Sequence, residues 1–132
     1  MKEIYIIDEI RTNNFSDPER EEKVQELWTK VLKKLGDRPK ISIHAVYFLY
    51  EDGYKGNYTL ALGTDIYETD KLVIVGDDHL MLKADMTEED GVLKAWERIW
   101  EMEEKEQIDR AYLVDYETHY TNGNVELYIS VK

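Results

Sequence analysis

Apolar residues recur at three- and four-residue spacing in two parts of the chain, and each part predicts an amphipathic helix. The first helix is expected to begin at Asp17, because an acceptor side chain followed by Pro18 suits a first turn, and to end at Gly36. The second is expected to begin at Thr87 or Asp90 and to end in a charged stretch. The two apolar stripes consist of Val24, Leu27, Trp28, Val31, Leu32, Leu35 and of Val92, Leu93, Trp96, Ile99, Trp100.

Short apolar or alternating runs between these helices predict β-strands. Asn122-Gly123 separates the last two runs, and this dipeptide between strands is a strong hairpin signal. The run after Gly76 is expected either to continue the run before it or to pair with it. The predicted strands cover residues 2–10, 41–51, 57–66, 71–75, 79–84, 111–120 and 125–131.

The order strand, helix, strand, strand occurs twice. A shift of about 68 residues lays Trp28 on Trp96 and lays the downstream hairpins on each other, so we expect pseudo-repeats at about 1–67 and 68–132. Two such units predict an α+β fold with one mainly antiparallel sheet, two helices on one face and a groove between the repeats. The whole chain, 1–132, is expected to be a single domain.

Composition narrows the classes of function. The chain of 132 residues has no cysteine, which excludes disulfides and thiol nucleophiles, and its formal charge of −12 disfavours nucleic acid and favours cations. The same charge is also typical of soluble cytoplasmic proteins. No apolar run approaches the length of a membrane span and no secretory signal is evident, so we expect no membrane contact and a cytoplasmic location.

Sequence motifs for metal, cofactor or triad chemistry are missing. His44, His79 and His119 lie on three separate segments without ligand spacing, so we expect no metal site. The chain has no Gly-x-Ser-x-Gly elbow and no glycine-rich phosphate loop, so we expect neither a serine triad nor a cofactor.

The last hairpin interleaves carboxylates with phenol rings, and Glu117 is our main candidate for a functional residue. An exposed Glu117 would be an ordinary surface carboxylate, whereas a buried one needs hydrogen bonds or a cation. Trp28 and Trp96 have two interpretations as well: they are core residues of their helices, or they face each other across the groove.

The closing segment resembles that of the GyrI-like effector-binding domains, which also occur as the drug-sensing half of bacterial multidrug transcription regulators. The similarity lies in Asp115-Tyr116-Glu117-x-x-Tyr120 and in the strand 125–129, which reads VELYI. Earlier pieces agree in order: Ile10-Arg11-Thr12, Leu27-Trp28, Ala45-Val46-Tyr47, Tyr50 with Gly53, Gly63, and Trp96-x-x-Ile99.

The resemblance implies a duplicated fold with a ligand groove in which Glu117 contacts cationic aromatic molecules. It also implies that rings line the groove, and the expected ligand-binding residues are Glu117, Trp28, Trp96, Tyr47, Tyr128 and Tyr116. The sequence contains no helix-turn-helix, so we expect a stand-alone form without direct nucleic-acid binding.

We therefore expect a binding domain for lipophilic aromatic, cationic small molecules, acting in drug sensing or sequestration and working with a separate regulatory protein. The alternative is a hydrolase of reactive electrophiles with Glu117 as general base and a tyrosine as proton donor, and it leaves open whether the protein is an enzyme. A third interpretation fills the groove with a segment of a partner protein.

Overall fold

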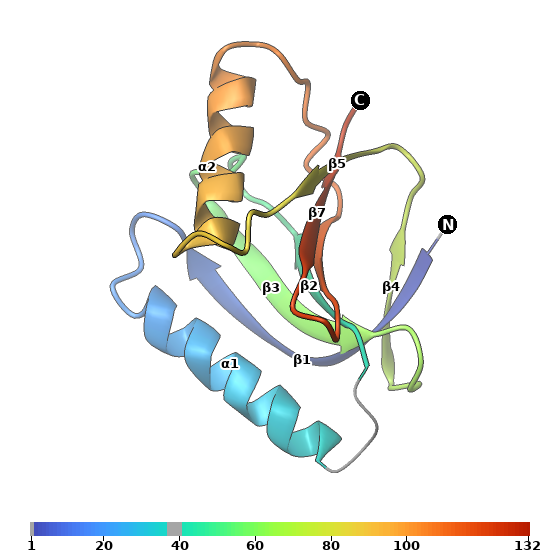
Figure 1. Ribbon diagram of the computed structural model, residues 1–132. Helices are drawn as coiled ribbons and strands as arrows, with labels where there is room; N and C mark the ends of the chain where they lie inside the picture. Colours follow the sequence, from blue (N-terminus) through green and yellow to red (C-terminus); the bar gives the residue numbers. More distant parts are fainter. Residues whose placement is uncertain (1, 37–40) are drawn as a thin grey trace.

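The computed structural model describes residues 2–36 and 41–132, which form two helices and one seven-stranded sheet (Figure 1). The strand pairs are all antiparallel, in the order β4-β1-β3-β2-β6-β7-β5, so the predicted α+β class with one antiparallel sheet is confirmed. The elements are β1 (Lys2–Asn13), α1 (Arg20–Leu35), β2 (Ile43–Phe48), β3 (Asn57–Thr64), β4 (Lys71–Val75), β5 (His79–Lys83), α2 (Gly91–Glu104), β6 (Asp115–His119) and β7 (Val125–Ser130).

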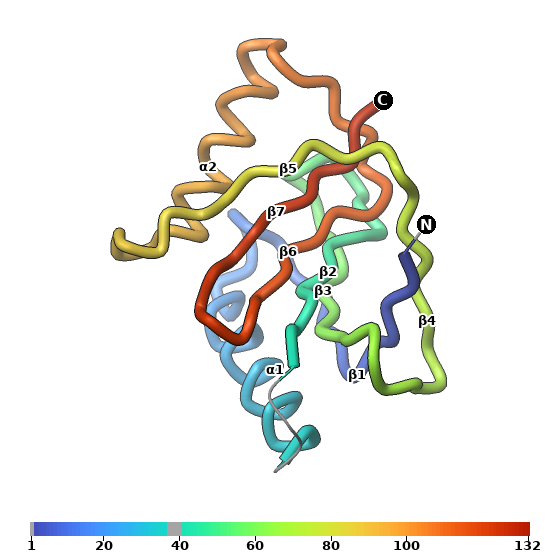
Figure 2. Tube along the Cα trace, turned by 45° about the vertical axis from the view of Figure 1, so that its right-hand side comes forward, coloured from blue at the N-terminus to red at the C-terminus, as the bar shows by residue number. Residues whose placement is uncertain are grey.

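The sheet is curled, because its two edge strands follow each other directly in the chain. Only residues 76–78 connect β4 at one edge to β5 at the other. Four residue steps span at most about 14 Å, whereas seven flat strands would extend over about 29 Å. The expectation that 79–84 continues or pairs with 71–75 is therefore wrong: β4 pairs with β1, and β5 pairs with β7. The connecting segment is seen in Figure 2.

Both helices lie on the same face of the sheet, as the sequence predicts. Leu27 and Val31 of α1 pack on alternate residues of β2 and β3, and Trp96 and Ile99 of α2 pack on β7. Figure 1 shows α1 and α2 next to different parts of the sheet. Within the sheet, the paired central strands β2 and β6 therefore lie between the part covered by α1 and the part covered by α2.

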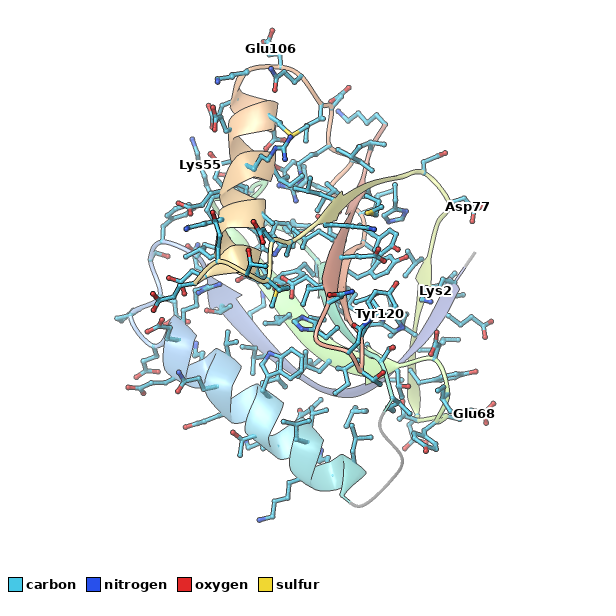
Figure 3. The ribbon with its side chains drawn as sticks, in the orientation of Figure 1. Lys2, Lys55, Glu68, Asp77, Glu106 and Tyr120 are labelled. Atoms are coloured by element: carbon cyan, nitrogen blue, oxygen red, sulfur yellow. The ribbon has the colours of Figure 1, made fainter. Side chains whose placement is uncertain are left out.

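The opposite face of the sheet carries a separate apolar cluster. Ile4, Val46 and Ala61 belong to it, and Tyr116 stacks on Tyr128 there with ring centroids 4.7 Å apart. Side chains of β1, β2, β3, β4, β6 and β7 thus form a second apolar cluster on the face away from the helices, and Figure 3 shows the side chains on the ribbon. Apolar burial on two faces explains why the central strands are more hydrophobic than half-exposed strands.

The first helix differs from the prediction at its N-terminus, whereas the second begins directly after Asp90, one of its two predicted starts. Asp17 accepts hydrogen bonds from the Glu19 N–H (2.9 Å) and from Thr12 and Lys23, so this residue forms a turn before α1 begins at Arg20. The helix α2 begins at Gly91 after Asp90 in the left-handed conformation, with φ of 59°. The shorter α1 follows from local side-chain bonds that the apolar stripe does not encode.

No helix within residues 2–36 and 41–132 is long and apolar enough to cross a membrane.

Replacing Gly63 by alanine should destabilise the protein. A Cβ at Gly63 would lie 2.4 Å from the carbonyl oxygen of Tyr5 on β1, next to the register shift between Ile6 and Asp8. Backbone atoms of the sheet can move aside only at a high energetic cost. We therefore expect the free energy of unfolding, measured by urea denaturation, to fall by about 1 to 3 kcal/mol. Gly76→Ala is the matched control, since nothing lies within 4 Å of its Cβ position. Equal stabilities of the two variants would refute the expected clash.

Candidate functional site

Strand β6 places alternate side chains between the two helices. Glu117 lies opposite Ala45 of β2 and Leu127 of β7, both of which belong to the helix face of the sheet. Because side chains alternate along a strand, Asp115 and His119 share this face with Glu117. The neighbouring Tyr116 lies on the opposite face. Two carboxylates are thus placed in the middle of the sheet, beneath the helical layer.

Glu117 is buried, with 3% of its surface exposed, and it is surrounded by donors. The Tyr47 hydroxyl donates to Oε2 at 2.8 Å, and the Trp96 indole N–H donates to the same oxygen. The other oxygen, Oε1, lies 2.8 Å from Nε2 of His119. The carboxylate is therefore held by three side chains from β2, α2 and its own strand.

The two predicted tryptophans approach Glu117 differently. Trp96 bonds to the carboxylate directly, whereas Trp28 of α1 packs edge-on against the His119 ring at a centroid distance of 4.8 Å. His119 thus lies between Trp28 and Glu117. Residues from both helices converge on this carboxylate, and Tyr47 lies 4.9 Å from Trp96 between ring centroids.

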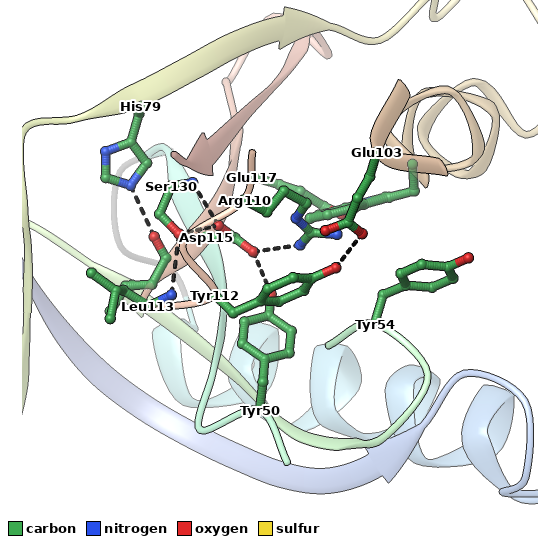
Figure 4. A network of polar contacts seen from close by, with 12 residues as sticks. Tyr50, Tyr54, His79, Glu103, Arg110, Tyr112, Leu113, Asp115, Glu117 and Ser130 are labelled. Atoms are coloured by element: carbon green, nitrogen blue, oxygen red, sulfur yellow. Dashed lines mark hydrogen bonds and ion pairs between the residues drawn. The ribbon is translucent and has the colours of Figure 1, made fainter. Parts of the chain in front are cut away.

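Asp115 forms the second buried carboxylate cluster (Figure 4). Its Oδ2 accepts from the Tyr50 hydroxyl (2.6 Å) and from Nη2 of Arg110 (2.7 Å). Its Oδ1 accepts from the backbone N–H of Ser130 (2.7 Å) and from the Ser130 hydroxyl (2.9 Å). The bonds of Asp115 to Arg110 and to Ser130 together hold the segment before β6 against the end of β7.

A small hollow lies beside these clusters and is lined mostly by aromatic rings. Its cavity volume is about 30 Å³, which is room for water, whereas ligand pockets usually measure about 300 to 1,000 Å³. Six rings contribute, together with one guanidinium. The lining residues are Asn14, Tyr47, Tyr50, Tyr54, Tyr58, Leu93, Trp96, Trp100 and Arg110.

Aromatic side chains also form the rim of this hollow. Tyr54 stacks on Trp100 with a centroid distance of 5.2 Å and an interplanar angle of 10°. Phe15, which is 61% exposed, packs against both rings. These three side chains come from the β1–α1 connection, the β2–β3 connection and α2. A ligand larger than water would have to displace part of this rim.

The structure brings together four of the six predicted ligand-binding residues and separates two. Glu117, Trp96 and Tyr47 are in direct contact, and Trp28 joins them through His119. The expected proximity of Tyr128 to Glu117 is wrong, and the expected ligand-binding residue Tyr116 is also separated from Glu117, because both rings stack on the opposite face. Tyr128 instead donates to Glu126 at 2.9 Å. The alternation of side chains along a strand, read from the sequence alone, did not show which face of the sheet forms the groove.

Several residues of the hollow were not singled out from the sequence. Arg110 lies at the start of the closing segment, and its isolated position among acidic and aromatic neighbours is the one signal that the sequence offers. Trp100 follows Trp96 by one helical turn and was assigned only to the apolar stripe. Tyr50 and Tyr54 lie around a turn, so their convergence on α2 depends on tertiary structure.

The phenols next to the buried carboxylates hold their protons strongly. Removal from water, followed by the charge of Glu117, raises the pKa of Tyr47 well above its ordinary value. Removal from water, followed by the charge of Asp115, does the same for the pKa of Tyr50. At the rim, a hydrogen bond to the exposed Glu104 raises the pKa of Tyr54 to about 12. These tyrosines are therefore neutral hydrogen-bond donors at physiological pH.

Within residues 2–36 and 41–132, no group of three or more His, Cys, Asp and Glu side chains is arranged to hold a metal ion. His119 and the two carboxylates are instead committed to the hydrogen bonds described above. This arrangement is chemically suited to binding through rings and charge, or to acid–base chemistry in which Glu117 accepts a proton and Tyr47 donates one to a bound molecule.

Comparison with known proteins shows the fold and no family. No family model matches the chain, and no curated protein matches it. The chain is similar to the crystal structure of integron cassette protein VCH_CASS2 from the mobile metagenome of Vibrio cholerae. The TM-score is 0.78 at 20% sequence identity, and the match covers 99% of this chain and 90% of that one. This similarity establishes a shared fold.

Stability should fall at alkaline pH because folding raises the pKa of Tyr47 and Tyr50. A raised pKa of an acid stabilises the fold fully below the unfolded value near 10, and this contribution is lost as pH rises towards the folded value. Each such phenol steepens the decline by about 1.4 kcal/mol per pH unit. Urea denaturation between pH 9.5 and 11.5 should show a shallower decline for Tyr47→Phe than for the unmodified chain. Identical slopes would show that Tyr47 ionises as freely in the folded protein as in the unfolded one.

Proposed function

We propose that this protein is a binding domain for lipophilic aromatic small molecules that carry a positive charge, used in drug sensing or sequestration. The observation that carries the proposal is the hollow of six rings, with the buried Glu117 directly behind two of them. Aromatic faces attract cations through their quadrupoles, and cages of such rings recognise quaternary ammonium groups.

The balance of buried charge favours a cation. Asp115 is neutralised by Arg110 in an ion pair in which both side chains are almost completely buried. The ionic contact that the described residues give Glu117 is with His119, which is charged only when protonated. A cation in the hollow would therefore complement an excess of negative charge.

The rings in contact with Glu117 are suited to this task. Tyr47 and Trp96 both donate their polar hydrogens to the carboxylate, and both rings line the hollow. Cation–π contact is worth about 0.5 to 2 kcal/mol, to which apolar burial adds. A ligand can enter only when Tyr54 and Trp100 at the rim move apart. The observed affinity is therefore the intrinsic affinity multiplied by the fraction of molecules in this open state. We therefore infer broad specificity with affinities in the micromolar range.

We propose further that the fold consists of two related units, β1-α1-β2-β3 and β5-α2-β6-β7, with the ligand groove between them. The sheet order supports this pairing, because β1-β3-β2 is followed by its mirror order β6-β7-β5. In this arrangement β4 lies outside the repeat. On this proposal the second unit starts beyond residue 75, after β4, instead of at about 68 as expected from the sequence, and the closing hairpin belongs to it.

Binding can be tested by quenching of tryptophan fluorescence with benzyltrimethylammonium and with neopentylbenzene, its uncharged isostere. We expect saturable quenching by the cation and at least about tenfold weaker binding of the isostere. Glu117→Gln should remove most of this preference, because the charge behind the rings is lost. Equal affinity for both compounds, or no saturable response, would refute the proposed function.

The matched control is Glu126→Gln, which changes the net charge of the protein equally. Glu126 lies on β7 next to Thr118 and bonds to Tyr120 and Tyr128, away from the helix face. We expect the preference for the cation to stay within twofold in this variant. A loss equal to that of Glu117→Gln would assign the effect to overall charge and not to the site.

The hydrolase is the second candidate, and it is favoured by the contact between Tyr47 and Glu117. Glu117 would take a proton from the attacking water, and Tyr47, which keeps its proton because of its raised pKa, would donate to the leaving oxygen. Styrene oxide is a suitable electrophilic aromatic probe. We expect diol formation to disappear in Glu117→Gln while binding of the inert analogue ethylbenzene is retained. Unchanged diol formation in this variant would exclude Glu117 as the general base.

A further inference from the structure

We propose that Arg110 is a ligand-binding residue that donates hydrogen bonds to an uncharged carbonyl oxygen of the molecule held in the hollow. This inference rests on the proposed function, because it concerns the same hollow, and it narrows the ligand to aromatic cations that carry an amide, ester or ketone group. Arg110 is one of the residues that line the hollow.

The donors of Arg110 are incompletely used within the protein. Its side chain is 1% exposed, and Nη2 bonds to Asp115 at 2.7 Å. Nε and Nη1 are also buried, and neither has a hydrogen-bond partner among the described residues. A guanidinium has five N–H donors, and buried donors without an acceptor destabilise a protein. An acceptor oxygen from a ligand would relieve this deficit.

The guanidinium is held rigidly in its position. Its central carbon lies 4.2 Å from the centre of the Tyr112 ring, and Tyr112 is in turn bonded to Glu103 of α2. The rings of Tyr50 and Trp96 each lie 6.0 Å from the same carbon. Figure 4 shows the guanidinium with Asp115 and Tyr112 on adjacent sides. A donor group fixed in this way binds an acceptor with little loss of conformational entropy.

The local charge favours a neutral acceptor over a carboxylate. Asp115 already neutralises Arg110, and Glu117 adds a second negative charge that bonds to the neighbouring Trp96. An anionic ligand would be repelled by Glu117. It would also lose its hydration without gaining a free cation, because the charge of Arg110 is already paired with Asp115. A carbonyl oxygen avoids both penalties while it accepts the free N–H groups.

Glu117 and Arg110, the two groups proposed to recognise the ligand, both lie next to the indole of Trp96. Trp96 donates to Glu117 through Nε1, and its ring is near the Arg110 guanidinium. A ligand ring packed on Trp96 would therefore reach the acidic end with one substituent and Arg110 with another. An arene with a cationic group and a carbonyl group at opposite positions has this geometry.

The proposal can be tested with four compounds in which charge and carbonyl group vary independently. These are benzyltrimethylammonium, neopentylbenzene, and the 4-carbamoyl derivative of each. In both pairs we expect the carbamoyl group to tighten binding by about tenfold or more, measured by tryptophan quenching, because a hydrogen bond to a charged donor is stronger than one to water. The charge effect tests the proposed function, and the carbamoyl effect tests Arg110.

A carbamoyl effect below twofold in both pairs, or no binding of any of the four compounds, would overturn the assignment of Arg110. A carbamoyl effect without a charge effect would refute the proposed preference for cations and keep the assignment of Arg110. Arg110→Lys retains a cation for Asp115 but removes the Nε donor, and it should abolish the carbamoyl effect. Arg98→Lys, at an exposed position of α2, is the matched control and should leave the effect unchanged.

The unmodified chain offers a second measurement that does not depend on the stability of a variant. The buried Nε–H of Arg110 should give a separate resonance in ¹H–¹⁵N spectra, identified by its loss in Arg110→Lys or by its proximity to Tyr112. We expect this resonance to shift on saturation with the carbamoyl compounds and to move far less with benzyltrimethylammonium. Equal shifts with both kinds of compound would overturn the proposed hydrogen bond.

Discussion

The burial of two carboxylates on one face of β6 is the constraint on which the rest of the site depends. A buried carboxylate without partners is strongly destabilising, so donors must converge on each of them. Asp115 receives Arg110, Tyr50 and the backbone and hydroxyl of Ser130. Glu117 receives donors from β2, α2 and β6. The polar network therefore joins the central strands to α2, in addition to the apolar contacts of the helix.

The two carboxylate clusters differ in charge, and this difference would set the orientation of a bound ligand. Asp115 has a permanent cation as its partner, whereas Glu117 is held by neutral phenol and indole donors and by a histidine. Arg110, which lines the hollow, has buried donors without a partner among the described residues, whereas Glu117 lies behind the rings of Tyr47 and Trp96. A ligand with complementary groups would be oriented, and the same rings that solvate Glu117 would provide its apolar surface.

Sequence patterns predicted much of the secondary structure because local forces control it. The three-and-four spacing of Leu27, Val31, Trp96 and Ile99 predicted both amphipathic helices, and Asn122-Gly123 marked the closing hairpin. The prediction for 79–84 was wrong because strand pairing depends on the curl of the whole sheet. Tyr116 and Tyr128 were misplaced because alternation along a strand gives two sets of residues but not the face that the helices cover.

By itself the sequence determined the two amphipathic helices, the antiparallel hairpin at the end of the chain and the presence of a carboxylate-rich, ring-rich final segment. Each of these properties depends on residues that are close in the chain. Only the tertiary structure decided that Glu117 is buried between Tyr47 and Trp96, and that Arg110 and the ring of Tyr50 meet at Asp115. The reason is that Tyr47 and Glu117 lie 70 positions apart, and no local pattern encodes which distant donors satisfy a buried charge.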